Sequence, residues 1–371
     1  MTEKLVMVLF NAFILGTILI VQLLTTRVSR RNILLGVRIP ADKMETKEVK
    51  DIIKGFKREN LIIGIPSLII ISLIIYFTDD ISFFVLSTFL YIGILFFIYL
   101  RWNKKSKELK KFKKWHKLVR KEGIIDQNLS RDKITGGVIS QKWFLIPVAI
   151  ILLNIIIGLA IYPFLPSTLP THWDLQGNVD GYMNKSISAV LLMPLAQGFV
   201  AIAIYLSYFF IKKAKQHINP RNPEGSMRKN IIFRKVWSTY FIITLILVEI
   251  LFTIINMMTL GIFTNMKLFN IFSFVITGVL IVGAILLGII VGQGGDRLKL
   301  GDDHESGNDY DIDDDKQWKL GNTIYFNPQD KSIFVEKRVG IGWTVNVGRP
   351  LGLILMVFPI IIVIVSLIVT K

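Results

Sequence analysis

The chain has 371 residues, 52% of them apolar, and a mean hydropathy of +0.54, a composition typical of bilayer-embedded proteins. It contains no cysteine, which excludes disulfides, cysteine-ligated metal clusters and thiol catalysis. The formal net charge of +17 alone would suggest a nucleic-acid-binding protein, but the charges lie between long apolar segments and argue against that class. The composition therefore predicts an integral membrane protein.

Eight apolar segments reach, or nearly reach, the length of about 20 residues that a helix needs to cross a bilayer. They are residues 5–24, 61–77, 81–100, 143–165, 187–211, 236–258, 268–291 and 351–370. The second segment is the shortest, and only Thr78, Asp79 and Asp80 separate it from the third. We therefore predict an all-α polytopic membrane protein with about eight transmembrane helices.

The basic residues are concentrated in every second connecting segment. Residues 25–60, 101–142, 212–235 and 292–350 hold 10, 14, 8 and 8 of the 44 lysines and arginines. Basic loops remain on the cytoplasmic side of a membrane. This pattern predicts a multi-pass protein of the cell membrane with both termini extracytoplasmic. Anionic membrane lipids are the expected partners of the basic charge, without direct contact to nucleic acid.

Two of the basic segments also carry apolar residues at helical spacing. Val49 and Phe56 belong to such a stripe in the first basic loop, and Leu109, Phe112 and Trp115 to another that continues the third apolar segment. Both patterns are typical of amphipathic helices that lie on the membrane surface. An acidic protein partner is the alternative for the second stripe.

The C-terminal part of the chain divides into three segments. Residues 292–317 are rich in aspartate, but a calcium-binding loop starting at Asp309 would need glycine and glutamate where Asp314 and Leu320 stand. We predict an acidic cytoplasmic linker there. In residues 318–350, short β-prone runs at 323–326, 333–336 and 343–347 predict a small cytoplasmic strand element. Residues 351–371 form the final helix, and residues 1–291 a seven-helix membrane region.

The predicted outer loop, residues 169–185, is dense in side chains that can bind a ligand. His172 and Asp174 are two residues apart and would share one face of an extended segment, and a turn near Gly177 would bring Asp180 back toward them. The candidate ligand-binding residues are His172, Trp173, Asp174, Gly177, Asp180, Tyr182, Asn184 and Lys185. The alternative is a loop tied to itself by hydrogen bonds and a Lys185 ion pair. The spacing matches no specific metal motif, and we expect neither a metal nor a cofactor.

The pattern Leu-Pro170-x-His172-x-Asp174-x-x-Gly177-x-x-Asp180-x-Tyr182-x-x-Lys185, followed by an apolar segment, resembles the signature of the SdpI-type membrane family. These bacterial multi-pass proteins carry an outer-loop domain of unknown function. The family usually has tryptophan where Tyr182 stands and often asparagine where Asp174 stands. Residues 36–40 and 326–350 also resemble segments of longer relatives. The resemblance implies immunity to a secreted peptide or toxin, with signalling to a cytoplasmic regulator.

One carboxylate, Glu249, lies near the middle of the sixth apolar segment, where an ionised group costs at least about 2.5 kcal/mol. Thr253 and Asn256 follow on the same helical face. Candidate partners on other segments are Asn154, Gln197 and Asn11. A protonated Glu249 would join helices through one of these amides. Alternatively, it would be a proton- or ligand-sensing site reached from the outer loop.

Three functions remain open at this point. The first hypothesis is a non-enzymatic membrane protein for immunity to, or sensing of, an extracellular peptide, toxin or envelope ligand. The second is a proton-coupled transporter that uses Glu249. The third is a metal-dependent membrane hydrolase with a site at His172, Asp174 and Asp180. The sequence has no Gly-x-Ser-x-Gly element and no Walker-type phosphate loop, so we expect no enzyme activity.

Overall fold

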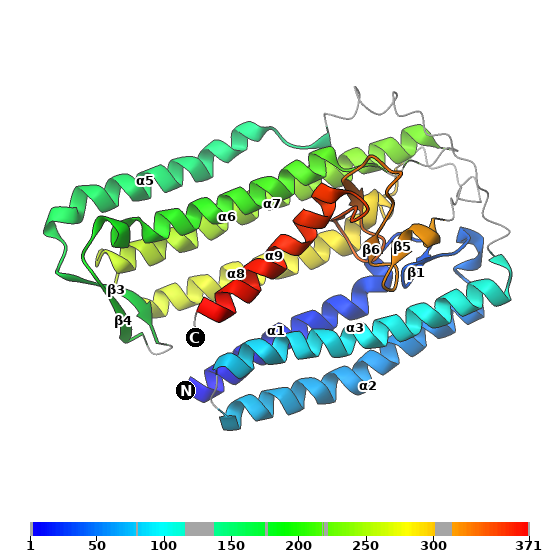
Figure 1. Cartoon of the computed structure of the whole chain (residues 1–371), viewed down its shortest axis with the longest axis horizontal. Coiled ribbons are helices and arrows are strands. Elements are labelled where there is room, and N and C mark those ends of the chain that lie inside the picture. Colours follow the sequence, from blue (N-terminus) through cyan, green and yellow to red (C-terminus); the bar gives the residue numbers. More distant parts are fainter. Residues whose placement is uncertain are drawn as a thin grey trace. The chain divides into compact units, whose positions relative to one another are not determined.

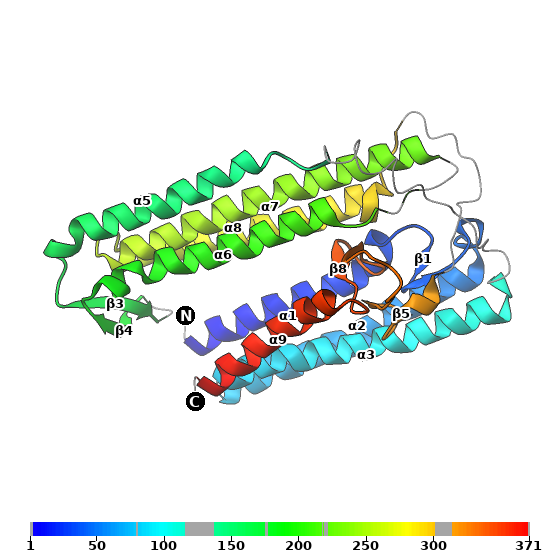
Figure 2. The ribbon, with the colours of Figure 1, turned by 45° about the horizontal axis from the view of Figure 1, so that its top comes forward.

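The computed structural model describes residues 3–78, 81–115, 137–174, 177–216, 218, 222–300 and 314–369. Long helices make up most of these residues (Figures 1 and 2). Seven helices of the described residues are long and apolar enough to cross a membrane. The chain forms two compact units. The first comprises Met1–Ile134, Lys213–Phe233 and Leu287–Lys371, and the second Thr135–Lys212 and Arg234–Leu286.

Three helices of the first unit pack side by side: α1 (Glu3–Val28), α2 (Lys47–Thr78) and α3 (Ile81–Phe112) (Figure 1). Their shared core contains Leu15, Ile75, Tyr91 and Leu95, all at most 2% exposed. The Tyr91 hydroxyl donates to the Gly64 carbonyl (3.1 Å), where the absence of a side chain lets α3 approach α2. Burial of these apolar groups holds the three helices together.

The expected membrane-surface helix around Val49 and Phe56 is instead the beginning of α2. Helices α2 and α3 have 32 residues each, well beyond the length needed for a span, and their polar ends pack on each other. The Trp102 ring lies against Gly55, and its Nε1–H donates to Glu59 Oε2 (2.6 Å). The apolar stripe is thus covered by protein. The part of the second stripe beyond Trp115 lies outside the described residues, as do Asp79 and Asp80.

The first unit also contains small hairpins. Strands β1 (Ile33–Leu34) and β2 (Val37–Arg38) pair antiparallel, as do β5 (Trp318–Lys319) with β6 (Ile324–Tyr325) and β7 (Phe334–Glu336) with β8 (Trp343–Val345). The strands predicted near 323–326, 333–336 and 343–347 are present, and β5 joins them. Asn346 is fully buried and donates to the carbonyls of Asn327, Asp330 and Ser332, which fixes the loop between β6 and β7. Helix α9 (Pro350–Val369) follows.

We call residues 314–349 the C-terminal module. It holds together through backbone as well as side-chain bonds, because Tyr325 and Asn346 form a parallel bridge and Val347 N–H donates to Tyr325 O (3.0 Å). Asp314 and Asp315, the last two aspartates of the predicted acidic linker (residues 292–317), belong to this module. The aspartates from Asp302 to Asp313 lie outside the described residues.

The second unit contains the predicted outer loop. Helix α5 (Leu145–Ile161) leads into strands β3 (Thr168–Trp173) and β4 (Val179–Asn184), and α6 (Ile187–Lys213) follows. Helices α7 (Pro223–Thr259) and α8 (Met266–Val291) begin and end in different units. Leu169 of β3 is fully buried against Ala189, Val190 and Leu260. This apolar cluster fixes the base of the β3–β4 hairpin on the helices of its own unit.

Candidate functional site

The residues predicted to bind a ligand form the β3–β4 hairpin, whose turn is built by Asp174. Asp174 Oδ1 accepts the N–H of Asn178 (2.8 Å) and Oδ2 accepts its Nδ2 (2.9 Å). Gly177 in the same turn has φ +93°, a conformation that favours glycine. Both residues therefore have a structural role in the turn.

Lys185 closes the opposite end of the hairpin. Its Nζ donates to the carbonyls of Leu165 (2.8 Å) and Pro163 (3.2 Å), and its backbone N–H donates to Ser167 O (2.8 Å). Among the described residues, these carbonyl contacts take the place of the Lys185 ion pair that the self-tied loop would have, because the chain leaving α5 presents oxygen atoms beside the ammonium. Lys185 thus ties the hairpin to the segment that precedes it.

The open face of the hairpin carries the remaining polar signature residues. His172 Nδ1 lies 2.5 Å from Asp180 Oδ1, and the two side chains are 72% and 48% exposed. Tyr182 is 64% exposed, and Asn184 is also exposed. Asp180, Tyr182 and Asn184 alternate along β4 and share one face, opposite the face that contains Met183. We call His172, Asp180, Tyr182 and Asn184 the open-face residues.

The turn brings Asp180 back to His172, as expected, and their side chains are in contact. Asp174 lies one residue beyond the end of β3, and its carboxylate binds Asn178 across the turn. The ladder shifts register between Pro170 and His172 and again between His172 and Trp173. Trp173 is half-buried and pairs with Val179. The described residues contain no group of three or more His, Cys, Asp or Glu that could hold a metal ion.

A second set of predicted residues forms a buried polar cluster between α5, α6 and α7. Asn154 Nδ2 donates to Thr253 Oγ1 (2.8 Å) and Gln197 Oε1 (3.3 Å), and Asn256 Nδ2 donates to Asn154 Oδ1 (3.3 Å). Asn154, Gln197 and Asn256 are at most 1% exposed. These buried amides therefore join three helices through hydrogen bonds.

The Glu249 side chain stands outside these bonds. Its backbone carbonyl accepts from Gln197 Nε2 (3.1 Å) and Thr253 Oγ1 (2.8 Å). The carboxyl group is fully buried, and neither of its oxygens has a hydrogen-bond partner among the described residues. The described residues form no bond between the Glu249 carboxyl and an amide, because Asn154 and Gln197 bind Thr253, each other and the Glu249 backbone carbonyl instead. Asn11, another expected partner, lies in α1 of the first unit, and its side chain also lacks a described partner.

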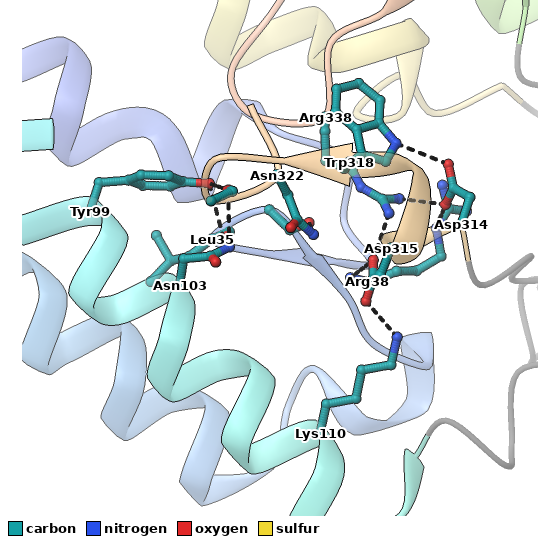
Figure 3. A network of polar contacts seen from close by, with 12 residues as sticks. Leu35, Arg38, Tyr99, Asn103, Lys110, Asp314, Asp315, Trp318, Asn322 and Arg338 are labelled. Atoms are coloured by element: carbon teal, nitrogen blue, oxygen red, sulfur yellow. Dashed lines mark hydrogen bonds and ion pairs between the residues drawn. The ribbon is translucent and has the colours of Figure 1, made fainter. Parts of the chain in front are cut away.

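A third polar site, which the sequence interpretation missed, joins the C-terminal module to the first loop (Figure 3). Asn103 Nδ2 on α3 donates to Leu35 O (2.7 Å) and Gly321 O (3.0 Å), and the Tyr99 hydroxyl lies within hydrogen-bonding reach of the same two carbonyls. Asn322 Nδ2 donates to Gly36 O (2.7 Å). Two hairpin turns are thereby clamped together on α3.

Charged side chains lie to one side of this clamp (Figure 3). Arg338 donates to Asp314 Oδ1 (2.8 Å) and Asp315 Oδ1 (2.6 Å), and Lys110 to Asp315 Oδ2 (2.7 Å). Arg38 Nε is 3.4 Å from Asp314 Oδ1. Arg338, Arg38 and Lys110 are at most 7% exposed in their side chains. The aspartates therefore neutralise buried cations from the first loop, α3 and the module.

A further carboxylate links the module to the chain that follows α6. Asp330 accepts from Lys215 Nζ (2.9 Å) and from the Ser332 N–H (2.9 Å). Burial alone would raise the pKa of the Asp330 carboxyl, but these bonds outweigh it and lower the pKa below its usual value. Burial raises the pKa of the neighbouring Tyr325 phenol, which donates to Asp330 Oδ2 (3.0 Å).

One sequence signal could have indicated the clamp. Leu35-Gly36 and Leu320-Gly321 repeat the same dipeptide in two short β-prone stretches, and all four residues have positive φ. A non-glycine residue at positive φ is uncommon and indicates a tight turn. The pairing of the two turns through α3 depends on contacts between segments more than 200 residues apart.

Two regions of the chain match known protein families, and they contain the hairpin and part of the C-terminal module. Residues 149–198, which span most of α5, the hairpin and the first part of α6, match a domain of unknown function (DUF1648). Residues 328–353, which include β7 and β8, match a family of unknown function (DUF5808). No curated protein and no solved structure matches the chain. The chain is thus a helical protein with candidate membrane spans that carries two domains of unknown function, consistent with the resemblance to the SdpI-type family.

Proposed function

We propose that this protein is a non-enzymatic SdpI-like immunity or sensing protein of the cell membrane. In this proposal, the β3–β4 hairpin faces the outside and binds an extracellular peptide, toxin or envelope ligand. The supporting observation is that different residues of the hairpin maintain its structure and form its exposed face. Asp174, Gly177 and Lys185 maintain the loop, whereas the open-face residues are exposed and directed away from the buried Leu169.

The membrane topology forms part of the same proposal. It takes the seven candidate spans together with α9, which is 20 residues long, as eight crossings. The distribution of lysine and arginine supports an orientation with both termini outside and the C-terminal module in the cytoplasm. The first unit gathers the ends of α1, α3 and α8 around this module, for example through Arg30 with Glu336 and Gln293 with Gly342. The module is therefore suited to contact a cytoplasmic regulator.

The test expresses variants with single open-face substitutions in a bacterial strain from which the gene for this protein has been deleted. We expect the wild-type chain to protect the strain from a membrane-active peptide identified in a panel, and His172→Ala or Asp180→Asn to lose that protection. Met183→Ala, on the opposite face of β4, is the matched control and should protect fully. Equal membrane levels are verified by immunoblot. Full protection by both open-face variants would contradict the proposal.

Proton-coupled transport is a second candidate, favoured by one observation. A fully buried carboxyl without a described partner is unusual, and intramembrane acids often carry protons. Purified protein in liposomes with a pH gradient should then move a peptide substrate, and Glu249→Gln should abolish the movement. Thr253→Val, which alters the neighbouring amide cluster but keeps the acid, is the control. Peptide flux that persists in Glu249→Gln would contradict a role of Glu249 in proton-coupled transport.

A further inference from the structure

The two edges of the hairpin expose different backbone groups. The Lys185 N–H donates to Ser167 O (2.8 Å), so these residues form a hydrogen-bonded pair. Hydrogen-bonded and non-hydrogen-bonded pairs alternate along an antiparallel ladder. The register then gives non-hydrogen-bonded pairs at Thr168–Asn184 and Pro170–Tyr182. The N–H and C=O groups at such positions point away from the partner strand.

The β3 edge is poorly suited to accept another strand. Pro170 has no N–H to donate, and register shifts flank His172. The β4 edge lacks such obstacles, because Tyr182 and Asn184 each offer an N–H and a C=O. No backbone hydrogen bond joins β4 to an element other than β3 in the described part of the chain. The hairpin therefore has one blocked edge and one open edge.

We propose that the outer edge of β4 binds an extended peptide, which adds to the hairpin as a third strand. This inference rests on the ligand-binding function proposed above and specifies its mode. Tyr182 and Asn184 are two residues apart, so their donors and acceptors repeat at a spacing of about 6.8 Å. An extended peptide presents the complementary groups at the same spacing, and its side chains alternate between the two faces of the sheet.

The side chains beside this edge favour a cationic peptide. The Asp180 carboxylate is 48% exposed, and its Oδ1 faces His172, whereas Oδ2 has no partner among the described residues. Lys185, the cation at the base of the hairpin, is held by the carbonyls of Pro163 and Leu165. A lysine or arginine of the added strand would pair with Asp180 across the ladder. The exposed Tyr182 ring would cover the apolar part of that side chain.

The experiment measures binding of a defined probe to the purified full-length protein in nanodiscs. The probe is a fluorescent, end-blocked octapeptide in which Lys-Val-Thr-Val occurs twice. Its control has the same side chains, but alternate amides are N-methylated, which removes the donors on one edge. We expect the probe to bind and the methylated control to bind at least tenfold more weakly. Hydrogen exchange of residues 179–184 should slow at least fivefold with the probe only.

Substitutions in β4 separate the backbone from the side chain. Tyr182→Pro removes the outward N–H but no bond to β3, and it should weaken probe binding at least tenfold. Tyr182→Ala retains the N–H and should weaken binding less than threefold. Equal loss in the two variants, equal binding of the methylated probe, or no binding to wild type would overturn strand addition. Loss of protection by His172→Ala would still stand in these cases, so the two proposals fail separately.

Discussion

Single residues with a steric or electrostatic role determine how the first loop meets the C-terminal module. Gly36 has φ +84°, and a Cβ at this position would lie 2.5 Å from the Tyr99 hydroxyl and 2.9 Å from Gly321 O. Asn322 also has positive φ and is fully buried. The turns can approach each other only because these positions tolerate a left-handed backbone and, at Gly36, have no side chain.

We therefore expect Gly36→Ala to destabilise the protein by about 2–4 kcal/mol, through the positive φ and the overlap with Tyr99 and Gly321. Chemical denaturation of the detergent-solubilised protein, followed by tryptophan fluorescence, measures the change. Gly16→Ala in α1, where a Cβ would meet no atom within 4 Å, is the matched control and should cause no loss. Equal stability of the Gly36 and Gly16 variants would show that the turns do not require this close approach.

Asp330 should make the module sensitive to acid. Its pKa is lowered in the folded protein, so the ionised form is favoured more strongly in the folded than in the unfolded state. The resulting stability is complete above the ordinary value of 3.8 and is lost as the pH falls through the lower folded value. Asp330→Asn should be less stable at neutral pH and should lose less stability below about pH 4.

The measurement is the unfolding midpoint as a function of pH for wild type and Asp330→Asn. Lys215→Met is a useful second variant, because it removes the 2.9 Å bond from Lys215 Nζ that stabilises the Asp330 carboxylate. This substitution should reduce the difference in unfolding midpoint between neutral and acidic pH without eliminating it, since the Ser332 N–H still donates to Asp330. Parallel pH curves for all three proteins would exclude Asp330 as the source of acid sensitivity.

At the scale of secondary-structure elements, the length of the apolar segments predicted the long helices, and β-prone runs predicted the strands of the C-terminal module, because local sequence determines both. The ends of α2 and α3 were misplaced for a tertiary reason. The stripe containing Val49 and Phe56 has the same pattern whether it covers lipid or packs on protein. Only tertiary contacts decide: Val49 is buried against the first loop and Trp115, and Phe56 in the core of α1, α2 and α3. The turn of the hairpin was predictable from Gly177, but the register shifts at His172 were not, since they depend on strand pairing.

The charged cluster around Asp315 should behave as a coupled unit. Asp315→Ala leaves the buried Lys110 and Arg338 without one of their carboxylate partners. We therefore expect the free energy of unfolding to fall by roughly 2–4 kcal/mol. Lys110→Met in the same chain should restore part of this loss, giving a coupling energy of at least about 1 kcal/mol. Denaturation of the two single variants and the double variant measures the coupling.

The control for this cycle is an exposed ion pair in the same unit. Glu45 and Lys50 are 2.9 Å apart, but their side chains are 85% and 53% exposed. Glu45→Ala should change the stability by less than about 0.5 kcal/mol, because water and salt screen the pair. A similarly small effect of Asp315→Ala, or strictly additive effects with Lys110→Met, would mean that the buried cluster contributes little to docking of the module.

At the scale of the whole molecule, two regions that match families of unknown function lie in different compact units, and α7 and α8 belong to both units. Because α7 and α8 are continuous helices, they connect the unit with the hairpin directly to the unit with the C-terminal module. A receptor role requires the hairpin and the module to be on opposite sides of the membrane. The alternation of basic loops predicts this arrangement, which can be tested directly.

The chain contains no cysteine, so single cysteines can report its topology. Asn178 in the hairpin turn is exposed, and Lys50 near the start of α2 has a 53% exposed side chain. Ser106, on the neighbouring α3, is fully buried and would not react from either side. We expect Asn178→Cys to react with an impermeant maleimide in intact cells, and Lys50→Cys to react only after lysis. The cysteine-free parent is the labelling control. Protection of Asn178→Cys in intact cells together with labelling of Lys50→Cys would place the hairpin inside, where it could not bind an extracellular ligand.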